Sequence, residues 1–546
     1  MSKKTGAAIA HGNENFAQED WMQIKTPEVL VKFPIESLVS RRSFVFARAG
    51  FGKSNLNKLL FSKLYEHTPT VKKRADKAVP VGTVIFDPDG EYFWPDDKGR
   101  PGLCDVPHLQ EKLVVFTSRK NPSPFYQSFV AGGIKLDIRR LRPSDVIAIA
   151  LPPDKQDQQN VRKLRGLSQD DWAELVNQIH DNGNATPLEI IHELLDLEER
   201  QEAEALAARG NMTTIVRMLH DKSSQLMDML IHALSQGKLC VIDVSQMRGG
   251  QALVLSGLIL RRIFDRNQAE FTTAEANTIP VIAVVEEAQS VLNEKASAAE
   301  PYIAWVKEGR KYDLGAVLIT QQPGSIPAEI LSQGDNWFIF HLLSAADLTS
   351  VKKANAHFSD DLLSSLLNEP IPGQGVFWSS VGGKPYPVSL RVHLFEHLYK
   401  PLDTSYNKPS VKTFAHQLKA EFQAVAGRPV DSTPKPAEPN HKNELKDNTA
   451  AKTSHEDETV DVLEQIENAA IEALQKNKLL ISKIEGEGAA WGSVKAFFLE
   501  VLPKNIDDRD AMAYRLVAKA MDKIYGPQKT AWHTFKQDRK TYVKKS

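Results

Sequence analysis

The stretch from residue 43 to residue 65 constrains the fold more than any other part of the sequence. The apolar run SFVFA leads into RAGFGKS and then into NLNKLLFSKLY, whose apolar residues recur at helical spacing. A strand that turns through a glycine-rich loop into a helix points backbone N–H groups and a helix N-terminus at one spot, where they can hold phosphate. We therefore predict a phosphate-binding loop from Ala47 to Ser54 within an α/β fold.

Short apolar runs alternate with helical patterns from about residue 41 to residue 400. Several runs are apolar throughout, as expected for strands that are buried on both faces of a parallel sheet. We expect an α/β core with a mostly parallel sheet, built from strands at Ser43–Ala47, Thr83–Phe86, Leu113–Phe116, Lys238–Val244, Val281–Val285, Ala316–Thr320 and Trp337–His341.

Other segments stand apart from this core. Residues 1–40 precede it, and residues 145–236 resemble a charged helical insertion, either an interaction module or a solvated subdomain that covers a sheet edge. Residues 426–457 carry four prolines and almost no large apolar residues, which predicts a flexible linker. Residues 458–546 return to helical periodicity and predict a small α-helical C-terminal domain.

The predicted loop carries the residue types that a bound nucleotide needs. Glycines let the backbone approach phosphates, Lys53 is placed to hold the β and γ phosphates, and Ser54 is placed to bind Mg2+. Ala47 stands where the first glycine of this motif is usual. A chance Gly-Lys-Ser at a strand-helix turn is the alternative. The expected contacts with ATP in this loop are Ala49, Gly50, Phe51, Gly52, Lys53, Ser54 and Asn55.

Polar residues follow two later strands of the predicted sheet. Glu286 and Glu287 close the run IPVIAVV, where Glu286 would bind magnesium through water and Glu287 would activate the attacking water as general base. An exposed acidic pair that opens a helix is the alternative. Gln321 closes the next strand, where its amide would sense the γ phosphate, or would only precede a proline turn.

Five motifs follow one another along the chain. They are ARAGFGKS at 47–54, FDPDGEYF at 86–93, VVEEAQ at 284–289, EGRKYDLG at 308–315 and LITQQPGSIPAEILSQ at 318–333. This order resembles the HerA-like ATPases of the FtsK and HerA superfamily over residues 40–345. The resemblance implies that residues 41–400 form a RecA-like P-loop domain, which assembles as a hexameric ring and pumps double-stranded DNA through its centre.

The resemblance also assigns roles to acidic and amide side chains outside the loop. Asp87 and Glu91 of DPDGEY match the acidic hallmark of the family at the nucleotide site. Glu287 matches its catalytic acid, and Gln321 matches its polar sensor.

Arginines are assigned in the same way. Arg310 of EGRKYDLG matches an arginine that acts near the γ phosphate. Arg41, or its neighbour Arg42, matches an arginine that the adjacent subunit supplies. Such an arginine would explain why activity needs a ring, because a lone subunit lacks the complete constellation.

The sequence departs from the family pattern at three residues and in one segment. Ala47 replaces a glycine, Glu286 stands where aspartate is usual, and Gln322 stands where an arginine often follows the sensor glutamine. About forty residues precede the first strand, fewer than the N-terminal β-barrel that many HerA proteins use to dock a nuclease. We therefore do not expect nuclease docking of that kind.

Bulk composition says little about partners but something about the compartment. The chain has 68 basic and 69 acidic side chains, so a nucleic-acid surface would have to come from local clusters. Cys104 and Cys240 lack disulfide or metal-ligand spacing, which fits a reducing compartment. With no signal-peptide pattern and no apolar run of membrane-spanning length, we expect a cytoplasmic protein without membrane insertion.

One local cluster lies at the C-terminal end. Residues 529–546 interleave Trp532, Phe535 and Tyr542 with six lysines or arginines and one aspartate. Such a segment can grip nucleic-acid phosphates and stack on bases. A solvated basic helix end, which packs its aromatic rings on the preceding helices, is the interpretation that we favour from sequence.

The leading hypothesis is an ATP-dependent translocase or helicase that forms a homo-oligomeric ring, expected to be a hexamer, on double-stranded DNA. One alternative is a conjugation-type coupling ATPase, which moves DNA at a membrane pore. Another is an ATP-binding ring scaffold that organises a nuclease or another effector protein in phage defence or repair.

Overall fold

The computed structural model describes residues 37–73, 77–273, 276–293, 298–369, 371–381, 386–426, 470–471, 473–502, 509–526, 530–537 and 540–545. The chain divides into two compact units, residues 1–431 and residues 432–546, and each has its own hydrophobic core. Most of the predicted N-terminal segment and nearly all of the predicted linker lie outside the described residues.

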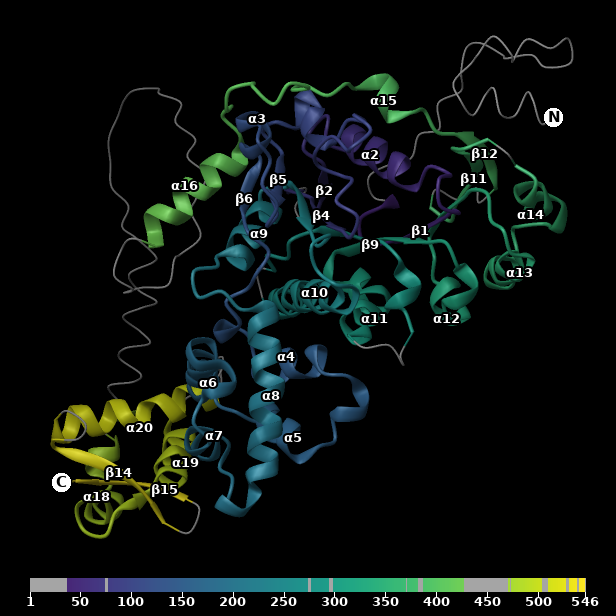
Figure 1. Ribbon diagram of the computed structural model, residues 1–546. Coiled ribbons are helices and arrows are strands. Elements are labelled where there is room, and N and C mark those ends of the chain that lie inside the picture. Colours follow the sequence, from purple (N-terminus) through teal and green to yellow (C-terminus); the bar gives the residue numbers. More distant parts are fainter. Residues whose placement is uncertain are drawn as a thin grey trace, which may run out of the picture. The chain divides into compact units, whose positions relative to one another are not determined.

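A ten-stranded sheet forms the centre of the first unit (Figure 1). Its order is β12-β11-β10-β1-β9-β8-β4-β7-β5-β6, with parallel pairing from β10 to β6 and antiparallel pairing at β11 and β12. The strands are β1 (Arg42–Phe46), β4 (Gly82–Asp87), β5 (Leu113–Phe116), β6 (Val130–Gly132), β7 (Leu239–Asp243), β8 (Val281–Val285), β9 (Leu314–Thr320), β10 (Asn336–Ile339), β11 (Gln374–Ser379) and β12 (Val388–Arg391). All the strands expected from sequence lie in this sheet, which confirms the mostly parallel α/β core.

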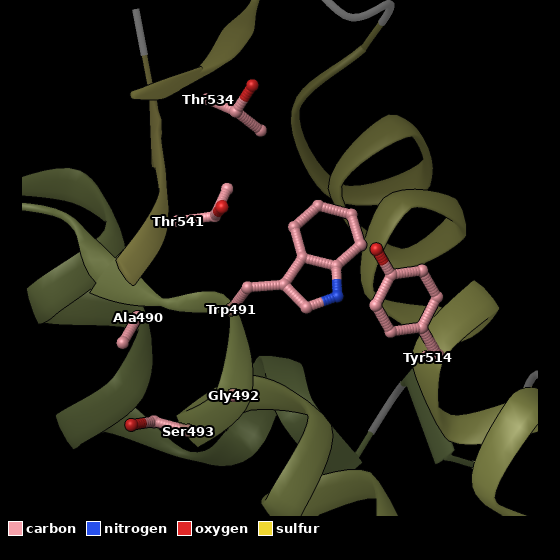
Figure 2. Close-up of a pocket in the computed structure, with 7 residues that line it drawn as sticks. All are labelled: Ala490, Trp491, Gly492, Ser493, Tyr514, Thr534 and Thr541. Carbon is pink, nitrogen blue, oxygen red and sulfur yellow. The ribbon is translucent and has the colours of Figure 1, made fainter. Parts of the chain in front are cut away.

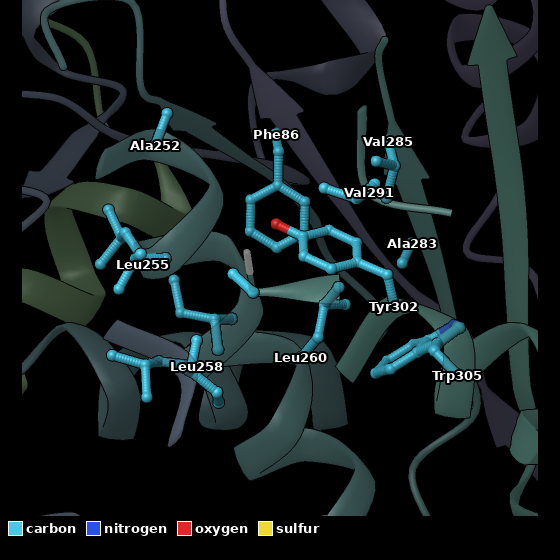
Figure 3. Close-up of a cluster of buried hydrophobic side chains, with 14 of the residues drawn as sticks. Phe86, Ala252, Leu255, Leu258, Leu260, Ala283, Val285, Val291, Tyr302 and Trp305 are labelled. Atoms are coloured by element: carbon cyan, nitrogen blue, oxygen red, sulfur yellow. The ribbon is translucent and has the colours of Figure 1, made fainter. Parts of the chain in front are cut away.

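Helices cover both faces of the sheet. Side chains of β1 alternate between the two cores: Phe44 and Phe46 face one, and Val45 faces the other. On the Val45 face lies α2 (Lys53–Leu64), and on the opposite face lie α10 (Gly249–Phe271), α11 (Ala299–Glu308) and α12 (Ala328–Leu331) (Figure 1). Figure 3 shows the core under β4 and β8, where Tyr302 and Trp305 of α11 lie near leucines of α10.

This unit also contains a small antiparallel hairpin and peripheral helices. The hairpin pairs β2 (Thr70–Lys72) with β3 (Ala78–Pro80). The helices are α3 (Pro124–Gln127), α13 (Ala345–Ala354), α14 (Asp360–Leu367), α15 (Phe395–Leu398) and α16 (Phe414–Ala426). In the described part of the chain, none of the helices is both long enough and apolar enough to cross a bilayer.

Between β6 and β7 the chain is helical. The helices are α4 (Pro143–Ala150), α5 (Gln159–Arg165), α6 (Gln169–Asn182), α7 (Leu188–Leu195), α8 (Glu202–Leu219) and α9 (Leu226–Ser235). Their buried side chains are continuous with the core under the sheet. Trp172 of α6 is fully buried, and its indole N–H donates to the carbonyl of Ile138 at 2.8 Å. This segment is therefore packed into the core of the first unit.

The second unit is mainly helical, as expected, but it also contains a sheet. It comprises α18 (Lys478–Glu485), β13 (Ala489–Ala490), α19 (Trp491–Val501), α20 (Arg509–Tyr525), β14 (Trp532–Gln537) and β15 (Lys540–Lys545). The three strands form one antiparallel sheet in the order β13-β15-β14.

The interpretation of residues 529–546 as a helix end is wrong. This end of the chain is the hairpin β14–β15, in which Trp532 and Val543 are buried and Phe535 stacks on Tyr542. The side chains of this segment alternate between the two faces of a sheet, which is the two-residue period of a strand and not the 3.6-residue period of a helix. Trp532 and Thr534 lie on one face of the sheet, and Phe535 lies on the other.

Candidate nucleotide site

The glycine-rich loop joins the end of β1 to the start of α2. Gly50 and Gly52 have φ angles of 80° and 95°, in the left-handed region where a side chain is disfavoured. Gly52 is the N-cap of α2 and has no side chain to bond the first-turn N–H groups. The start of α2 therefore faces the loop with its amide dipoles and the first-turn residues Lys53 and Ser54, as a phosphate site requires.

Lys53 faces acidic side chains from other strands. Its ammonium group interacts with four carboxylates, those of Glu287, Glu286, Asp89 and Glu91. Burial lowers the pKa of Lys53, and these carboxylates oppose that shift. The structure thus brings the loop together with three of the acidic residues predicted from sequence.

A hydrogen-bond chain links the loop to the ends of two neighbouring strands. The N–H of Ala49 donates to Gln321 Oε1 at 3.1 Å, and Gln321 Nε2 donates to Glu287 Oε1 at 3.0 Å. Gln321 follows β9, which pairs with β1 in parallel, and Glu287 follows β8, which pairs with β9. Gln321 therefore contacts both the loop and the predicted catalytic acid.

The Glu287 carboxylate is held from a second side. Gln289 Nε2 donates to Glu287 Oε2 at 2.6 Å, and Thr320 Oγ1 donates to Gln289 Oε1 at 2.6 Å. The backbone of Glu287 has φ 49° and ψ 44°, a left-handed conformation that costs a non-glycine residue about 1–3 kcal/mol. This turn ends the strand and directs the carboxylate toward Gln321.

Glu286 contacts a tyrosine that the sequence analysis did not single out. The Tyr92 hydroxyl donates to Glu286 Oε1 and accepts from Asn57 Nδ2 of α2 at 3.0 Å. Burial raises the pKa of Glu286 to about 7. The Tyr92 hydroxyl opposes this shift because it stabilises the ionised carboxylate. Tyr92 lies within the DPDGEYF motif, so the motif itself was the available signal.

Asp87 is part of the same strand edge but does not reach the loop. Its buried carboxylate accepts the N–H groups of Gly90, Glu91 and Tyr92 at 2.8, 3.2 and 2.9 Å. Burial raises the pKa of Asp87 to about 7, and Asp243, opposite it on β7, adds to the shift. Asp87 therefore shapes the turn that carries Tyr92 and Glu91.

Asn55, which we expect from the sequence to contact ATP, bonds a segment near the start of α15. Its Nδ2 donates to the carbonyl of His393 at 2.8 Å, and its Oδ1 accepts the N–H of Phe395 at 2.7 Å. Phe51 stacks on His341, with ring centroids 4.4 Å apart. The Asn55 side chain thus anchors the first turn of α2, and the Phe51 ring anchors the loop.

The arginines predicted from sequence lie at the other edge of the sheet. Arg41 precedes β1, and Arg310 precedes β9, whereas the loop and Gln321 follow these strands. Arg41 contacts Asp335 at 3.1 Å, and Arg310 is exposed. The structure does not bring either arginine to the glycine-rich loop of the same chain.

Together, the glycine-rich loop at the start of α2 and the acidic and amide residues at the ends of β8 and β9 define a P-loop ATPase. The family model for the central domain of the helicase HerA matches residues 22–263. The DNA double-strand break repair helicase HerA of Saccharolobus solfataricus is 23% identical over 383 residues, which cover 67% of each chain. HerA of Pyrococcus furiosus is 23% identical over 423 residues, which cover 68% of each chain. The chain is therefore a P-loop ATPase that is similar in sequence to the central domain of HerA.

Two solved structures have a limited similarity to the chain. VirB4 of Thermoanaerobacter pseudethanolicus is 14% identical with a TM-score of 0.37, over 65% of this chain and 89% of that one. The bacterial conjugative coupling protein TrwBdeltaN70 is 11% identical with a TM-score of 0.41, over 71% and 93%. The fold assignment rests on the sheet topology described above.

Substitutions at Lys53 and Glu287 should separate nucleotide binding from hydrolysis. Lys53→Ala should abolish ATP binding because the loop loses its only ammonium group. Glu287→Gln should bind ATP normally but hydrolyse it about 100-fold more slowly, or slower still, because the general base is lost. Equilibrium binding of a fluorescent ATP analogue and steady-state turnover measure the two effects. Glu66→Gln, at an exposed pair with Lys63, is the matched control; near-normal turnover in Glu287→Gln would reject the assignment.

The pH dependence of turnover should report on Glu286. With a pKa of about 7, Glu286 ionises as the pH rises through neutrality, so ATPase activity should rise over the same range. Tyr92→Phe removes a donor to the ionised carboxylate, which should raise the pKa of Glu286 further and move the midpoint of activity to higher pH. Initial rates at saturating ATP and Mg2+ measure this midpoint.

A matched control and a stability measurement accompany that experiment. Tyr126 also donates to a carboxylate, Asp105 at 2.6 Å, so Tyr126→Phe should leave the midpoint unmoved. Because the pKa of Glu286 is raised from 4.5, its contribution to the free energy of unfolding is present below pH 4.5 and is lost as the pH rises through about 7. An unchanged midpoint in Tyr92→Phe contradicts the role of Glu286.

Proposed function

We propose that the protein is a ring-forming ATPase that couples MgATP hydrolysis to movement along double-stranded DNA. The observation that carries the proposal is the division of the predicted site between two edges of the sheet. The loop, Glu287 and Gln321 lie at the carboxyl ends of the strands, and Arg41 and Arg310 lie at the amino ends. A site that needs such an arginine is completed by an adjacent subunit, which a head-to-tail ring supplies. The relatives named DNA double-strand break repair helicases support DNA as the substrate.

In this proposal the loop and the acidic residues divide the chemistry of hydrolysis. Lys53 and the N-terminus of α2 hold the β and γ phosphates. Ser54 and, through water, Glu286 would hold Mg2+, which prefers such oxygen ligands and usually keeps several waters. When bound, the ion neutralises charge on the phosphates. Glu287 accepts a proton from the attacking water, since its carboxylate is already oriented by Gln289 and Gln321.

Gln321 acts as the sensor in this scheme. Its amide oxygen accepts the N–H of Ala49, one of the loop amides that would face a phosphate, and its amide nitrogen donates to Glu287. A bound γ phosphate competes with Gln321 for the Ala49 N–H. Release of Gln321 from the loop would then change the contacts of the general base as ATP binds.

Arg41 is a better candidate than Arg42 for the arginine supplied in trans. Arg42 is anchored by three groups: its Nε donates to the Val306 carbonyl at 2.8 Å, and its guanidinium also contacts Asp335 and Gln333. The Arg41 side chain contacts Asp335 and is more exposed, at 26% against 13% for Arg42. Arg41 can leave its single ion pair at a modest cost.

Contacts with DNA in the centre of a hexameric ring would be made mainly to phosphates, so they would be independent of sequence and sensitive to salt. A cytoplasmic location agrees with Cys104 and Cys240, which are both free and buried.

The proposal predicts oligomers whose turnover responds to duplex DNA. Native mass measurement should find a closed ring in the presence of ATP, and duplex DNA should raise the ATPase rate several-fold, because translocation draws on successive hydrolysis events. A monomer whose turnover ignores duplex DNA would overturn the translocase while leaving the phosphate loop untouched. The ATPase rate of Glu287→Gln, measured with and without duplex DNA, gives the background rate of ATP hydrolysis.

Mixed rings should reveal an arginine that acts in trans. Arg41→Ala and Glu287→Gln should each be nearly inactive alone. When they are co-assembled in equal amounts, about one quarter of the interfaces pair an intact Glu287 with an intact Arg41 from the neighbour, so activity should return. The measurement is ATPase rate against mixing ratio.

Arg42→Ala mixed with Glu287→Gln is the matched control. Arg42 is structurally anchored, so its loss should lower the melting temperature rather than give complementation. If mixtures of Arg41→Ala with Glu287→Gln show only the sum of the two separate rates, Arg41 does not act on a neighbour.

A further inference from the structure

The second unit has an order of elements that is associated with DNA recognition. Helix α18 leads to the short strand β13, then to helices α19 and α20, and finally to the hairpin β14–β15. The first strand pairs with the last, which gives the sheet order β13-β15-β14. Two helices in sequence, followed by a hairpin whose second strand pairs with a first short strand, have the topology of a winged helix, in which α20 has the position of the recognition helix and β14–β15 has that of the wing.

A hollow of about 630 Å³ opens where these three parts meet. It is lined by Gly492 and Ser493 at the start of α19, by Tyr514 of α20, and by Thr534 and Thr541 of the hairpin. In Figure 2 the ring of Trp491 lies beside that of Tyr514, and both threonines extend from the strands. The ring centroids of Trp491 and Tyr514 are 5.3 Å apart. Hydroxyl groups and a helix N-terminus are groups that bind phosphate oxygens.

An exposed tyrosine and a nearby lysine border this hollow. Tyr514 is 55% exposed although it lies on a helix whose other large apolar residues are mostly buried. Lys495 lies over the Tyr514 ring at 5.9 Å. Lys519 is exposed elsewhere on α20, and Lys544 lies on the face of the hairpin opposite to Thr534 and Thr541. The hollow is therefore bordered by aromatic rings and one lysine, and further lysines lie on the same helix and hairpin.

The second face of the hairpin has the same character. Phe535 and Tyr542 stack across the strands at 5.4 Å, His533 follows at 6.2 Å, and Lys544 pairs with His533 in the register. Residues 509–546 contain ten lysines and arginines and three aspartates, although the whole chain is nearly neutral. Positive charge is thus concentrated in the recognition helix and the hairpin, where a polyanion can bind.

We propose that α20, the start of α19 and the hairpin β14–β15 form a second DNA-binding surface, separate from the ATPase unit, that docks on duplex DNA. Duplex DNA fits better than a single strand because α20, with 17 residues, is roughly 25 Å long and can lie in a major groove about 12 Å wide. The hydroxyl groups of the hollow and the helix N-terminus then contact the phosphates that border the groove. This inference rests on the proposed function for the identity of the nucleic acid and adds a DNA-binding site that does not depend on ATP.

The test measures binding of the full-length protein to a fluorescent duplex of about 30 base pairs, roughly three helical turns, without nucleotide and over a series of salt concentrations. The double variant Lys519→Glu/Lys544→Glu should weaken binding about ten-fold or more. It should also lower the slope of log affinity against log salt by about two, because each of the two lysines neutralises one phosphate. Tyr514→Ala, which changes no charge, should weaken binding several-fold because the tyrosine ring no longer packs against the DNA.

The matched control is Lys476→Glu/Lys483→Glu, which makes the same charge change at exposed residues of the same unit that lie outside α19, α20 and the hairpin. It should bind duplex DNA with nearly the wild-type salt slope. The ATPase rate without DNA and the melting temperature should be unchanged in all three variants, because none alters the nucleotide site or a buried residue.

Each outcome decides between the two proposals. If the two double variants weaken binding equally, only bulk charge is at work and the docking surface is rejected. Binding of an RNA duplex in preference to DNA also rejects it. If duplex DNA still stimulates ATP hydrolysis while neither Lys519→Glu/Lys544→Glu nor Tyr514→Ala affects binding, this inference fails and the translocase stands. If binding depends on these residues but duplex DNA never stimulates hydrolysis, the translocase fails and the surface stands.

Discussion

Parallel pairing of β1 with β9 is the constraint on which the nucleotide site depends. The register matches Phe46 with Thr320, so the loop that follows β1 and Gln321, which follows β9, begin at the same level of the sheet. On the far side of β9, β8 ends beside Leu318 and delivers Glu286 and Glu287 to this edge. Because parallel strands place all their carboxyl ends on one edge, residues more than two hundred positions apart meet there without any special loop.

The same edge concentrates carboxylates at some electrostatic cost. Asp87 and Glu286 are both buried enough to raise their pKa values to about 7, and burial lowers the pKa of Lys53. The protein offsets these costs locally: three backbone N–H groups bond Asp87, and the Tyr92 hydroxyl bonds Glu286. One turn, residues 87–92, therefore supplies both a buried acid and the hydroxyl that holds a second acid near Lys53.

Sequence patterns predicted those parts of the structure that depend on local order. Seven strands of the ten-stranded sheet were visible as mostly apolar runs, whereas β6, β11 and β12 were not predicted. The loop was visible because strand, glycines and helix are contiguous. The direction of Asn55 was not predictable, since it depends on Phe395, 340 residues later in the chain. The contact of Tyr92 with Glu286 also depends on a turn whose shape is set by a buried carboxylate. At the C-terminal end, the basic and aromatic composition did not predict that side chains alternate between two faces, as they do in a strand. Cross-strand pairing, not composition, determines that hairpin.

The length of β9 sets the separation between Arg310 and Gln321. Its seven residues span roughly 23 Å at about 3.3 Å per residue, with Gln321 after one end and Arg310 before the other. The arginine side chain is far too short to cover this distance, and β9 cannot shorten while it is paired with β1 and β8. The same reasoning applies to Arg41 and the loop at opposite ends of β1. Within one chain, therefore, Arg310 does not reach the strand end that carries Gln321, and Arg41 does not reach the loop that follows β1.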